Sequence, residues 1–276
     1  MNSEDKNMDR EVSNFNVRLR TIKIRELIVG IIIAAIACGI TMAIFPQIAE
    51  NDDLMMIVLL TFVLLFFAWC LKGTTGVFTN VENVLLKDNR KEILYVMIIN
   101  LIFAHIFLLL MVLLDMLLGM TDPTWVSGID IDSVDLTPSA FMFSAIASII
   151  FAPILEELIF RGVLFNRLKI RVGIVPAMIL SSFLFAIGHD FGGIVSAFLF
   201  GICMCILYLK TDNIFITMSV HFLNNLLATF LEVVNSDALF VHPPGLFILA
   251  IAVAIATVLL IKYIFEETSK LRKAYS

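Results

Sequence analysis

The chain has 276 residues, of which 60% are hydrophobic and 16% are charged, and its mean hydropathy is +0.99. This composition excludes a water-soluble globular domain, in which about 25% of the residues would be charged. The formal net charge of −5 comes with no basic patch of the kind that binds nucleic acid, so we expect no nucleic-acid partner. The sequence therefore predicts an all-α protein that folds in a lipid bilayer.

Hydrophobic segments that are long enough to cross a bilayer as helices recur along the whole chain. We predict one polytopic bundle of about eight transmembrane helices. The predicted spans are 27–45, 54–71, 93–118, 139–160, 174–188, 193–209, 213–233 and 245–265. The fifth span is short, and only the sequence GHDFGG separates it from the sixth, so seven spans or a re-entrant segment are alternatives.

The positions of the basic residues predict how the bundle is oriented, because Lys and Arg are retained on the cytoplasmic side of short loops. All 19 of them lie before the first span, near the carboxyl end of the chain, or after the second, fourth and sixth spans. We therefore expect a multi-pass protein of the cell membrane with both termini in the cytoplasm. Its expected parts are a basic cytoplasmic segment (1–26), a transmembrane domain (27–265) and a cytoplasmic tail (266–276).

Few ionisable or amide side chains lie within the predicted spans. A charge at the bilayer centre costs about 3 kcal/mol or more, which makes such residues candidates for function. Those that we single out are His105, Asp115, Glu156, Glu157, Arg161 at the end of the fourth span, His189 at the end of the fifth, His221, Asn224 and Asn225. His105 and Asp115 are ten residues apart and lie on different helical faces, so we interpret His105 as a packing residue rather than as part of a proton relay.

The segment ILEELIFRG contains two adjacent carboxylates with different expected roles. Glu157 and Arg161 are four residues apart, a spacing at which an acidic residue pairs well with a basic residue that follows it. We interpret this pair as structural. Glu156 is rotated by about 100° from its neighbour and cannot share that partner equally well, so it needs another role. Pro153 removes the helical donor for the carbonyl of Ile149, which favours a kink and an opening for water.

Two later motifs place polar side chains on single helical faces. Phe185 and His189 in FAIGH are four residues apart, as are His221 and Asn225 in HFLNN. Each motif alone is typical of helix packing. Together with the carboxylates, the order E-E-x-x-x-R, F-x-x-x-H and H-x-x-x-N resembles the CPBP family over about 139–235. These are the CAAX-processing and bacteriocin-processing intramembrane proteases, also called the Abi family, and they include the eukaryotic CAAX prenyl endopeptidase.

The resemblance implies hydrolysis of a peptide bond in a membrane-embedded or membrane-associated substrate, with water as the nucleophile. Glu156 would be the general base, and His189 would help to bind or activate the water. His221 with Asn225 would polarise the scissile carbonyl and its oxyanion. The residues that would support the site are Glu157, Arg161 and Phe185. A carboxylate in a low-dielectric site is a suitable base, and donors aimed at a developing oxyanion contribute several kcal/mol.

The sequence leaves the involvement of a metal open. Glu156, His189 and His221 form a two-His, one-Glu set, which is a known environment for catalytic zinc. The family is often labelled metalloprotease on this ground, and a metal-free glutamate mechanism has also been argued for it. We favour a metal-free site or a weakly bound divalent metal such as zinc, because Glu156 would otherwise have to serve as both ligand and base.

A function from another class is the alternative. The chain would then be a non-catalytic membrane scaffold or a bacteriocin self-immunity protein, or, less in keeping with the spacing of its polar residues, a transporter. An unprocessed peptide that accumulates in an active-site variant would favour the protease, whereas full function of that variant would favour the scaffold.

The predicted spans place the two candidate histidines at different depths. His221 would lie in the cytoplasmic third of its helix, and His189 nearer to the opposite side. Straight helices would not bring them together. Kinks near Pro153 and Pro176, a longer fourth helix, or a broken segment around 192–193 would do so.

Overall fold

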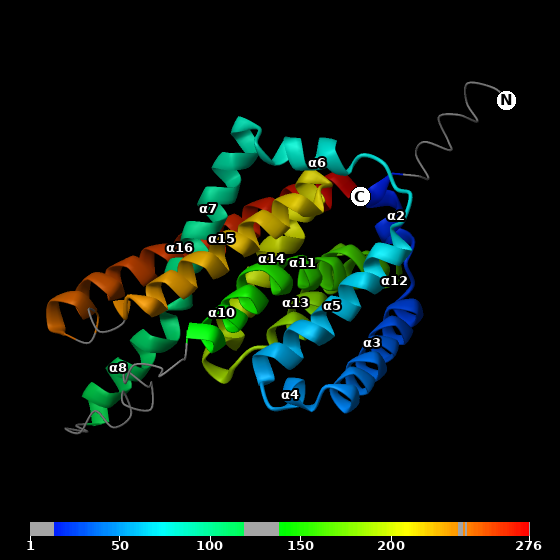
Figure 1. Cartoon of the computed structure of the whole chain (residues 1–276). Helices are drawn as coiled ribbons and strands as arrows, with labels where there is room; N and C mark the ends of the chain where they lie inside the picture. Colours follow the sequence, from blue (N-terminus) through cyan, green and yellow to red (C-terminus); the bar gives the residue numbers. More distant parts are fainter. Residues whose placement is uncertain (1–13, 119–137, 237–239, 241, 276) are drawn as a thin grey trace.

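A computed structural model describes residues 14–118, 138–236, 240 and 242–275, and its helices are shown in Figure 1. The first helices are α2 (Phe15–Thr21), α3 (Ile24–Ile44), α4 (Pro46–Ala49), α5 (Asp52–Cys70), α6 (Val77–Val84), α7 (Lys87–Ala104) and α8 (Ile106–Leu118). One long helix then consists of α10 (Pro138–Ile146), the π-helical η1 (Ala147–Phe151), α11 (Ala152–Glu156), the π-helical η2 (Glu157–Phe165) and α12 (Asn166–Val172). The last helices are α13 (Ile174–Ala186), the 3-10 turn η3 (Phe191–Gly193), α14 (Ile194–Thr211), α15 (Ile214–Val233) and α16 (Pro243–Tyr275).

The prediction of an all-α polytopic bundle is confirmed. Within the described ranges no β-strand is present, and seven helical segments are long and apolar enough to cross a membrane. The remaining predicted span, 174–188, is α13, whose 13 residues extend about 20 Å. That is less than the roughly 30 Å of a bilayer core. The described part of the bundle thus has seven long apolar helical segments and the short helix α13.

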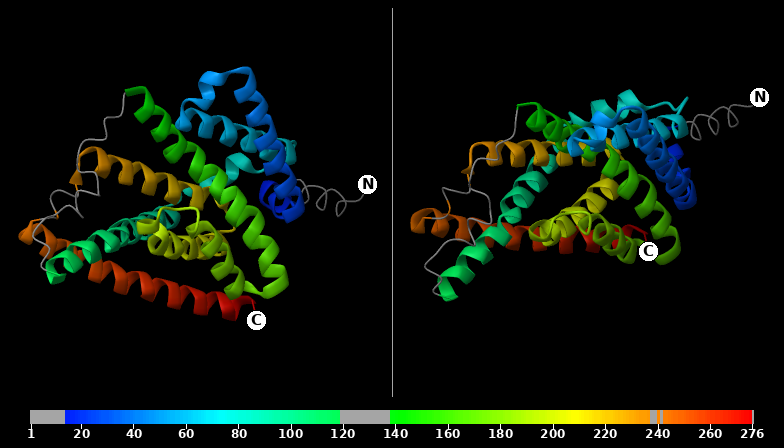
Figure 2. Two further views of the ribbon diagram at one scale, coloured as in Figure 1. Left: turned by 90° about the horizontal axis from the view of Figure 1, so that it is seen from below. Right: turned by 60° about the horizontal axis from the view of Figure 1, so that its bottom comes forward.

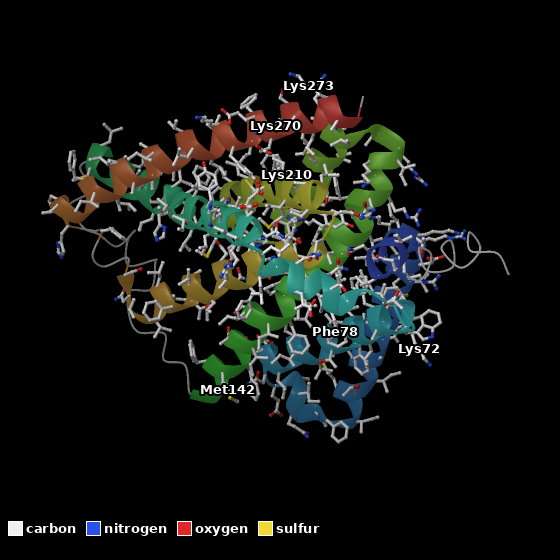
Figure 3. The ribbon with its side chains drawn as sticks, turned by 90° about the horizontal axis from the view of Figure 1, so that it is seen from above. Lys72, Phe78, Met142, Lys210, Lys270 and Lys273 are labelled. Atoms are coloured by element: carbon white, nitrogen blue, oxygen red, sulfur yellow. The ribbon has the colours of Figure 1, made fainter. Side chains whose placement is uncertain are left out.

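The loops that carry basic residues lie at one end of the bundle. Figure 1 shows α2, α6, α12 and the carboxyl end of α16 at this end, which we call the basic end, and α4, α8 and the amino end of α16 at the opposite end. Four charged side chains join α7, α14 and α16 here. Lys210 pairs with Glu92 and, at 2.9 Å, with Glu267, which also pairs with Lys270 at 2.6 Å. Figure 3 shows Lys210 and Lys270 where α14 and α16 meet.

The long helix of residues 138–172 lies in the middle of the fold. The left view of Figure 2 shows it between the hairpin of α3 and α5 on one side and α13 to α16 on the other. Its segments contact both groups, since η1 and α11 pack on α5 and on α15, while η2 packs on α13. The helix that carries the two adjacent glutamates therefore faces neighbours on both sides.

The amino-terminal helix α2 is docked into the basic end. Leu19 is fully buried and packs closely against Gly162, where an added Cβ would lie 2.7 Å from the Cδ2 atom of Leu19. Asn16 donates through Nδ2 to the carbonyl of Asp212 at 2.9 Å. Residues 15–21 of the predicted basic segment 1–26 are thus packed on the bundle, and residues 1–13 lie outside the described part of the chain.

The closest approach between α13 and α14 depends on two small residues. A Cβ on Gly201 would lie 2.8 Å from the Cβ and 3.1 Å from the Cα of Ser182, and Ser182 is fully buried. Small residues let helix backbones approach closely. In a membrane this matters because van der Waals packing, rather than the hydrophobic effect, drives helices to associate. This contact fixes α13 and α14 to each other on either side of the turn that contains His189.

We predict that Gly201→Ala destabilises the bundle by about 1–3 kcal/mol, because an added methyl group meets backbone rather than a flexible side chain. Thermal denaturation in detergent measures the effect. Gly39→Ala is the matched control, since a Cβ there meets nothing within 4 Å and alanine is the better helix former. Equal melting temperatures for the two variants would contradict the prediction.

Candidate active site

The ion pair between Glu157 and Arg161 is the buried centre of the site. Nη1 of Arg161 donates to Oε1 of Glu157 at 2.9 Å, and both side chains are 0% exposed. Nη2 of Arg161 donates to the carbonyl of Gly201 on α14 at 3.2 Å. The structure therefore contains the pair that the four-residue spacing predicts, and it adds a backbone acceptor from another helix.

The same carboxylate oxygen holds His221. Nδ1 of His221 lies 3.1 Å from Oε1 of Glu157, and only 3% of the His221 side chain is exposed. A carboxylate accepts, so Nδ1 carries the proton in this contact, and the partner at Nδ1 fixes how the ring is oriented. The other ring nitrogen, Nε2, points to Glu156, whose Oε2 lies 3.7 Å away. His221 is thus placed between the two adjacent glutamates.

Glu156 differs from Glu157 in exposure and in partners. Its side chain is 32% exposed, and its Oε2 atom is buried with no hydrogen-bond partner among the described residues. The 3.7 Å distance to His221 is longer than a direct hydrogen bond, which leaves that oxygen available to another donor. Glu156 is therefore the less enclosed of the two carboxylates.

His189 reaches this group through an aromatic contact. It lies just after α13, where Nδ1 is 3.1 Å from the carbonyl of Phe185. The rings of His189 and Phe185 are 4.7 Å apart, and those of Phe185 and His221 are 5.8 Å apart. Cζ of Arg161 lies 4.5 Å from the centre of the Phe185 ring, so Phe185 also covers the buried guanidinium. In the part of the chain described, no hydrogen bond or ion pair joins His189 to Glu156.

The predicted difference in depth between His189 and His221 is reduced because α13 is short and is followed by the 3-10 turn η3. Because α13 has only 13 residues, His189 follows it within the bundle instead of at the far end. The 3-10 turn η3 then leads into α14, which returns toward the basic end. Two of the alternatives for bringing the histidines together are present: the fourth helix continues past Arg161 to Val172, and the segment around 192–193 is broken by a 3-10 turn.

Asn225 bonds to backbone in the structure. Its Nδ2 atom donates to the carbonyl of Ser148 in η1 at 2.8 Å. It lies one turn after His221 on α15, as the H-x-x-x-N spacing predicts. The amide thus joins α15 to the long helix at a second point, beside the bond from His221 to Glu157.

The structure also shows site residues that the sequence motifs missed. Phe200 of α14 lies with its ring centre 5.1 Å from that of His221, and Gly201 supplies the carbonyl that accepts from Arg161. A glycine inside an apolar helix is the one signal that could have indicated a close approach at this point. Nothing in its local sequence distinguishes Phe200 from the other phenylalanines of the chain.

Two further polar residues lie away from the site. His105 is placed between α7 and α8, where its Nδ1 is 3.0 Å from the carbonyl of Leu101 and its ring is 5.9 Å from that of Phe240. The interpretation of His105 as a packing residue is confirmed. His242 is an exposed residue of the bend before α16, and the side chain of Asp115 lies outside the described residues.

The side chains do not form a metal-binding set. Between residues 14 and 275, apart from the undescribed positions, no three His, Cys, Asp or Glu side chains group as ligands of one metal ion. Glu156 and His221 face each other, but His189 is separated from them by Phe185. The three candidate ligands, Glu156, His189 and His221, thus do not fit a shared metal in this arrangement, and no reaction step is assigned to one.

We predict that Glu157→Ala and Arg161→Ala each destabilise the folded protein by about 3–5 kcal/mol, because each leaves a buried charge without its partner. The double variant should recover part of this loss. The exposed pair of Lys262 and Glu266, also four residues apart, is the matched control, and its single variants should melt close to the parent. A Glu157→Ala protein that melts with these controls would contradict the prediction.

Comparison with known proteins assigns the central part of the chain. Residues 138–227 match the family model described as Rce1-like, type II CAAX prenyl endopeptidase. The matched range runs from α10 into α15 and includes the two glutamates, both candidate histidines and Asn225. Searches of curated proteins and of solved structures give no match. Over this range the chain is therefore similar to the Rce1-like type II CAAX prenyl endopeptidases, and the residues outside 138–227 are not part of the match.

Proposed function

We propose that the protein hydrolyses a peptide bond of a membrane-embedded or membrane-associated substrate, with a water activated by Glu156. The observation that carries the proposal is the contrast between the adjacent glutamates. Glu157 is fully buried and its Oε1 atom holds Arg161 and His221, whereas Glu156 is 32% exposed and its Oε2 atom lies 3.7 Å from Nε2 of His221. One carboxylate is used for structure, and the other is free to take a proton.

In this mechanism Glu156 removes a proton from water while the hydroxide oxygen bonds to the scissile carbonyl carbon. The carboxylic acid then returns that proton to the leaving amine as the carbon–nitrogen bond breaks. His189 helps to position the water. Buried polar atoms without a protein partner support the presence of water, since such atoms are normally satisfied by protein or solvent. They include Oε2 of Glu156, Oε2 of Glu157 and Nε of Arg161.

His221 is proposed to stabilise the oxyanion. Its Nδ1–H donates to Glu157, so an imidazolium would have Nε2–H left to donate to the developing negative charge. The cluster would then contain two cations, Arg161 and His221, and two carboxylates. A buried group of charges is tolerated only when the charges are paired, and this set is neutral. The orientation of His221 by Glu157 is what makes the donor available in the right direction.

An apolar groove whose lining includes residues close to the site residues along the chain supports a membrane-associated substrate. It has a volume of about 1060 Å³ and is lined from α5, α6, α7, the long helix and α15. Pro153 and Leu158 of its lining flank the glutamates, and Met218 and Phe222 flank His221. We propose that the apolar part of the substrate, an apolar peptide segment or an attached lipid chain, lies in this groove while its peptide bond reaches Glu156.

We further propose that the protein lies in the cell membrane with the basic end and both chain termini in the cytoplasm. The support is the placement of the basic loops at one end of the bundle (Figure 1) together with the retention of Lys and Arg on the cytoplasmic side. A divalent metal has no assigned part in the proposed steps. Cleavage measured with and without a chelator tests this point directly.

We predict that Glu156→Gln lowers cleavage by about 10²–10⁴-fold, the usual contribution of a general base, while the protein folds as the parent does. The activity is measured by placing the protein in proteoliposomes together with a membrane proteome and identifying the released peptides by mass spectrometry. Glu232→Gln changes an exposed carboxylate on α15 and is the control, which should release the same peptides as the parent. Unchanged release by Glu156→Gln would favour the non-catalytic scaffold.

We predict that filling the groove lowers cleavage without unfolding the protein. Ala68 is exposed and lines the groove from α5, so Ala68→Trp should exclude an apolar chain from the groove. Substrate affinity should fall by about tenfold or more, because the substrate loses the apolar contact that burying one of its side chains provides. Leu65→Trp on the same helix is the control, because Leu65 is 57% exposed and is not part of the lining. Equal cleavage by the two variants would exclude the groove as the substrate site.

A further inference from the structure

Pro153 and the π-helical turn before it leave one backbone carbonyl without a donor in its own helix. The N–H of Ala152 donates to the carbonyl of Ala147, five residues earlier, which is the π-helical pattern of η1. In this pattern the carbonyl of Ser148 would accept from residue 153, but proline has no N–H. The α-helical donor for Ser148 would be Ala152, whose N–H is already used.

Asn225 supplies the missing donor from another helix. Its Nδ2 atom donates to the carbonyl of Ser148 at 2.8 Å. Inside a bilayer no bulk water is present to satisfy an unpaired backbone group, so an acceptor left without a donor destabilises the fold. The π turn with Pro153 after it is therefore compatible with the membrane because α15 brings an amide to this position.

The π turn of η1 matters for the site because it sets the direction in which the side chains of α11 point. Each π-helical bond spans five residues instead of four, so the residues after the turn are rotated relative to a continuous α-helix. Glu156 lies after η1, within the five residues of α11, and its Oε2 lies 3.7 Å from Nε2 of His221. His221 and Asn225 are one turn apart on α15, so the helix that presents the histidine also holds the turn that directs the glutamate.

We propose that Asn225 is a positioning residue, which satisfies the Ser148 carbonyl that Pro153 cannot and so holds the π turn that directs Glu156 toward His221. The amide then acts on the backbone of the enzyme. This differs from the role that the sequence motif suggests, which is contact with the oxyanion of the substrate. This inference rests on the proposed function for its cleavage readout only, since the effect on folding is independent of it.

The experiment compares Asn225→Ala in two backgrounds, the parent and Pro153→Ala. An alanine at 153 restores a backbone N–H, so the Ser148 carbonyl no longer needs the amide. In the parent, Asn225→Ala should lower the melting temperature by about 2–4 °C, the shift expected for one lost hydrogen bond in a protein of this size, and should reduce cleavage. In the Pro153→Ala background both losses should be much smaller, whatever Pro153→Ala does by itself.

Asn224→Ala is the matched control, because Asn224 is the neighbouring amide on α15 and makes no bond to η1. Its effect should be the same in both backgrounds.

If Asn225→Ala does not accumulate alone, recovery of folded protein in the double variant supports the proposal, and failure of the double variant overturns it. Equal loss of melting temperature in both backgrounds also overturns it. A restored melting temperature with an undiminished loss of cleavage would assign Asn225 to the substrate instead, and absence of cleavage by the parent would count against the proposed function alone.

Discussion

Oε1 of Glu157 accepts from Nη1 of Arg161 at 2.9 Å and lies 3.1 Å from Nδ1 of His221, and the arrangement of the other site residues depends on this shared oxygen. Glu157 and Arg161 are entirely enclosed, so each charge requires the other. The guanidinium uses a further donor on the carbonyl of Gly201, which brings α14 to the long helix. His221 brings α15 to the same point. A cluster of this kind tolerates little movement, because a partner displaced by an ångström leaves a charge unpaired in a low-dielectric interior.

The long helix of residues 138–172 is not regular around this cluster. It changes twice from α-helical to π-helical pattern, at η1 and at η2, and the adjacent glutamates lie where these two π-helical segments are joined through α11. π-helical turns carry a cost in backbone geometry and occur often at functional sites. Here the turn before Pro153 needs an outside donor, which α15 provides through Asn225. The same two helices are therefore joined twice, once by a charged contact and once by an amide, and the partly exposed Glu156 lies between these points.

The groove and the cluster show how one helix can serve two environments. On one side, Pro153 and Leu158 contribute to an apolar lining that suits a chain drawn from the bilayer. On the other, the side chains of Glu157 and Arg161 are 0% exposed. In the proposed mechanism, a substrate in the groove would meet Glu156, whose side chain is 32% exposed, at a boundary between apolar surface and solvent. Water needed for hydrolysis and an apolar substrate can meet at such a boundary without either crossing the packed core.

The sequence by itself determined the solvent, the all-helical class and the order of the polar residues. Hydropathy reveals membrane helices because a lipid-exposed backbone must satisfy its own hydrogen bonds. The spacing of Glu157 and Arg161 predicted their pair because side chains four residues apart share a face of one helix. Relations between helices were left open, namely the approach of Gly201 to Ser182 and the bond from Asn225 to Ser148. Spacing along the chain says which side chains share a face, but not which neighbouring helix that face meets or where a π turn rotates it. Only the tertiary structure decided those, because they depend on packing between segments tens of residues apart.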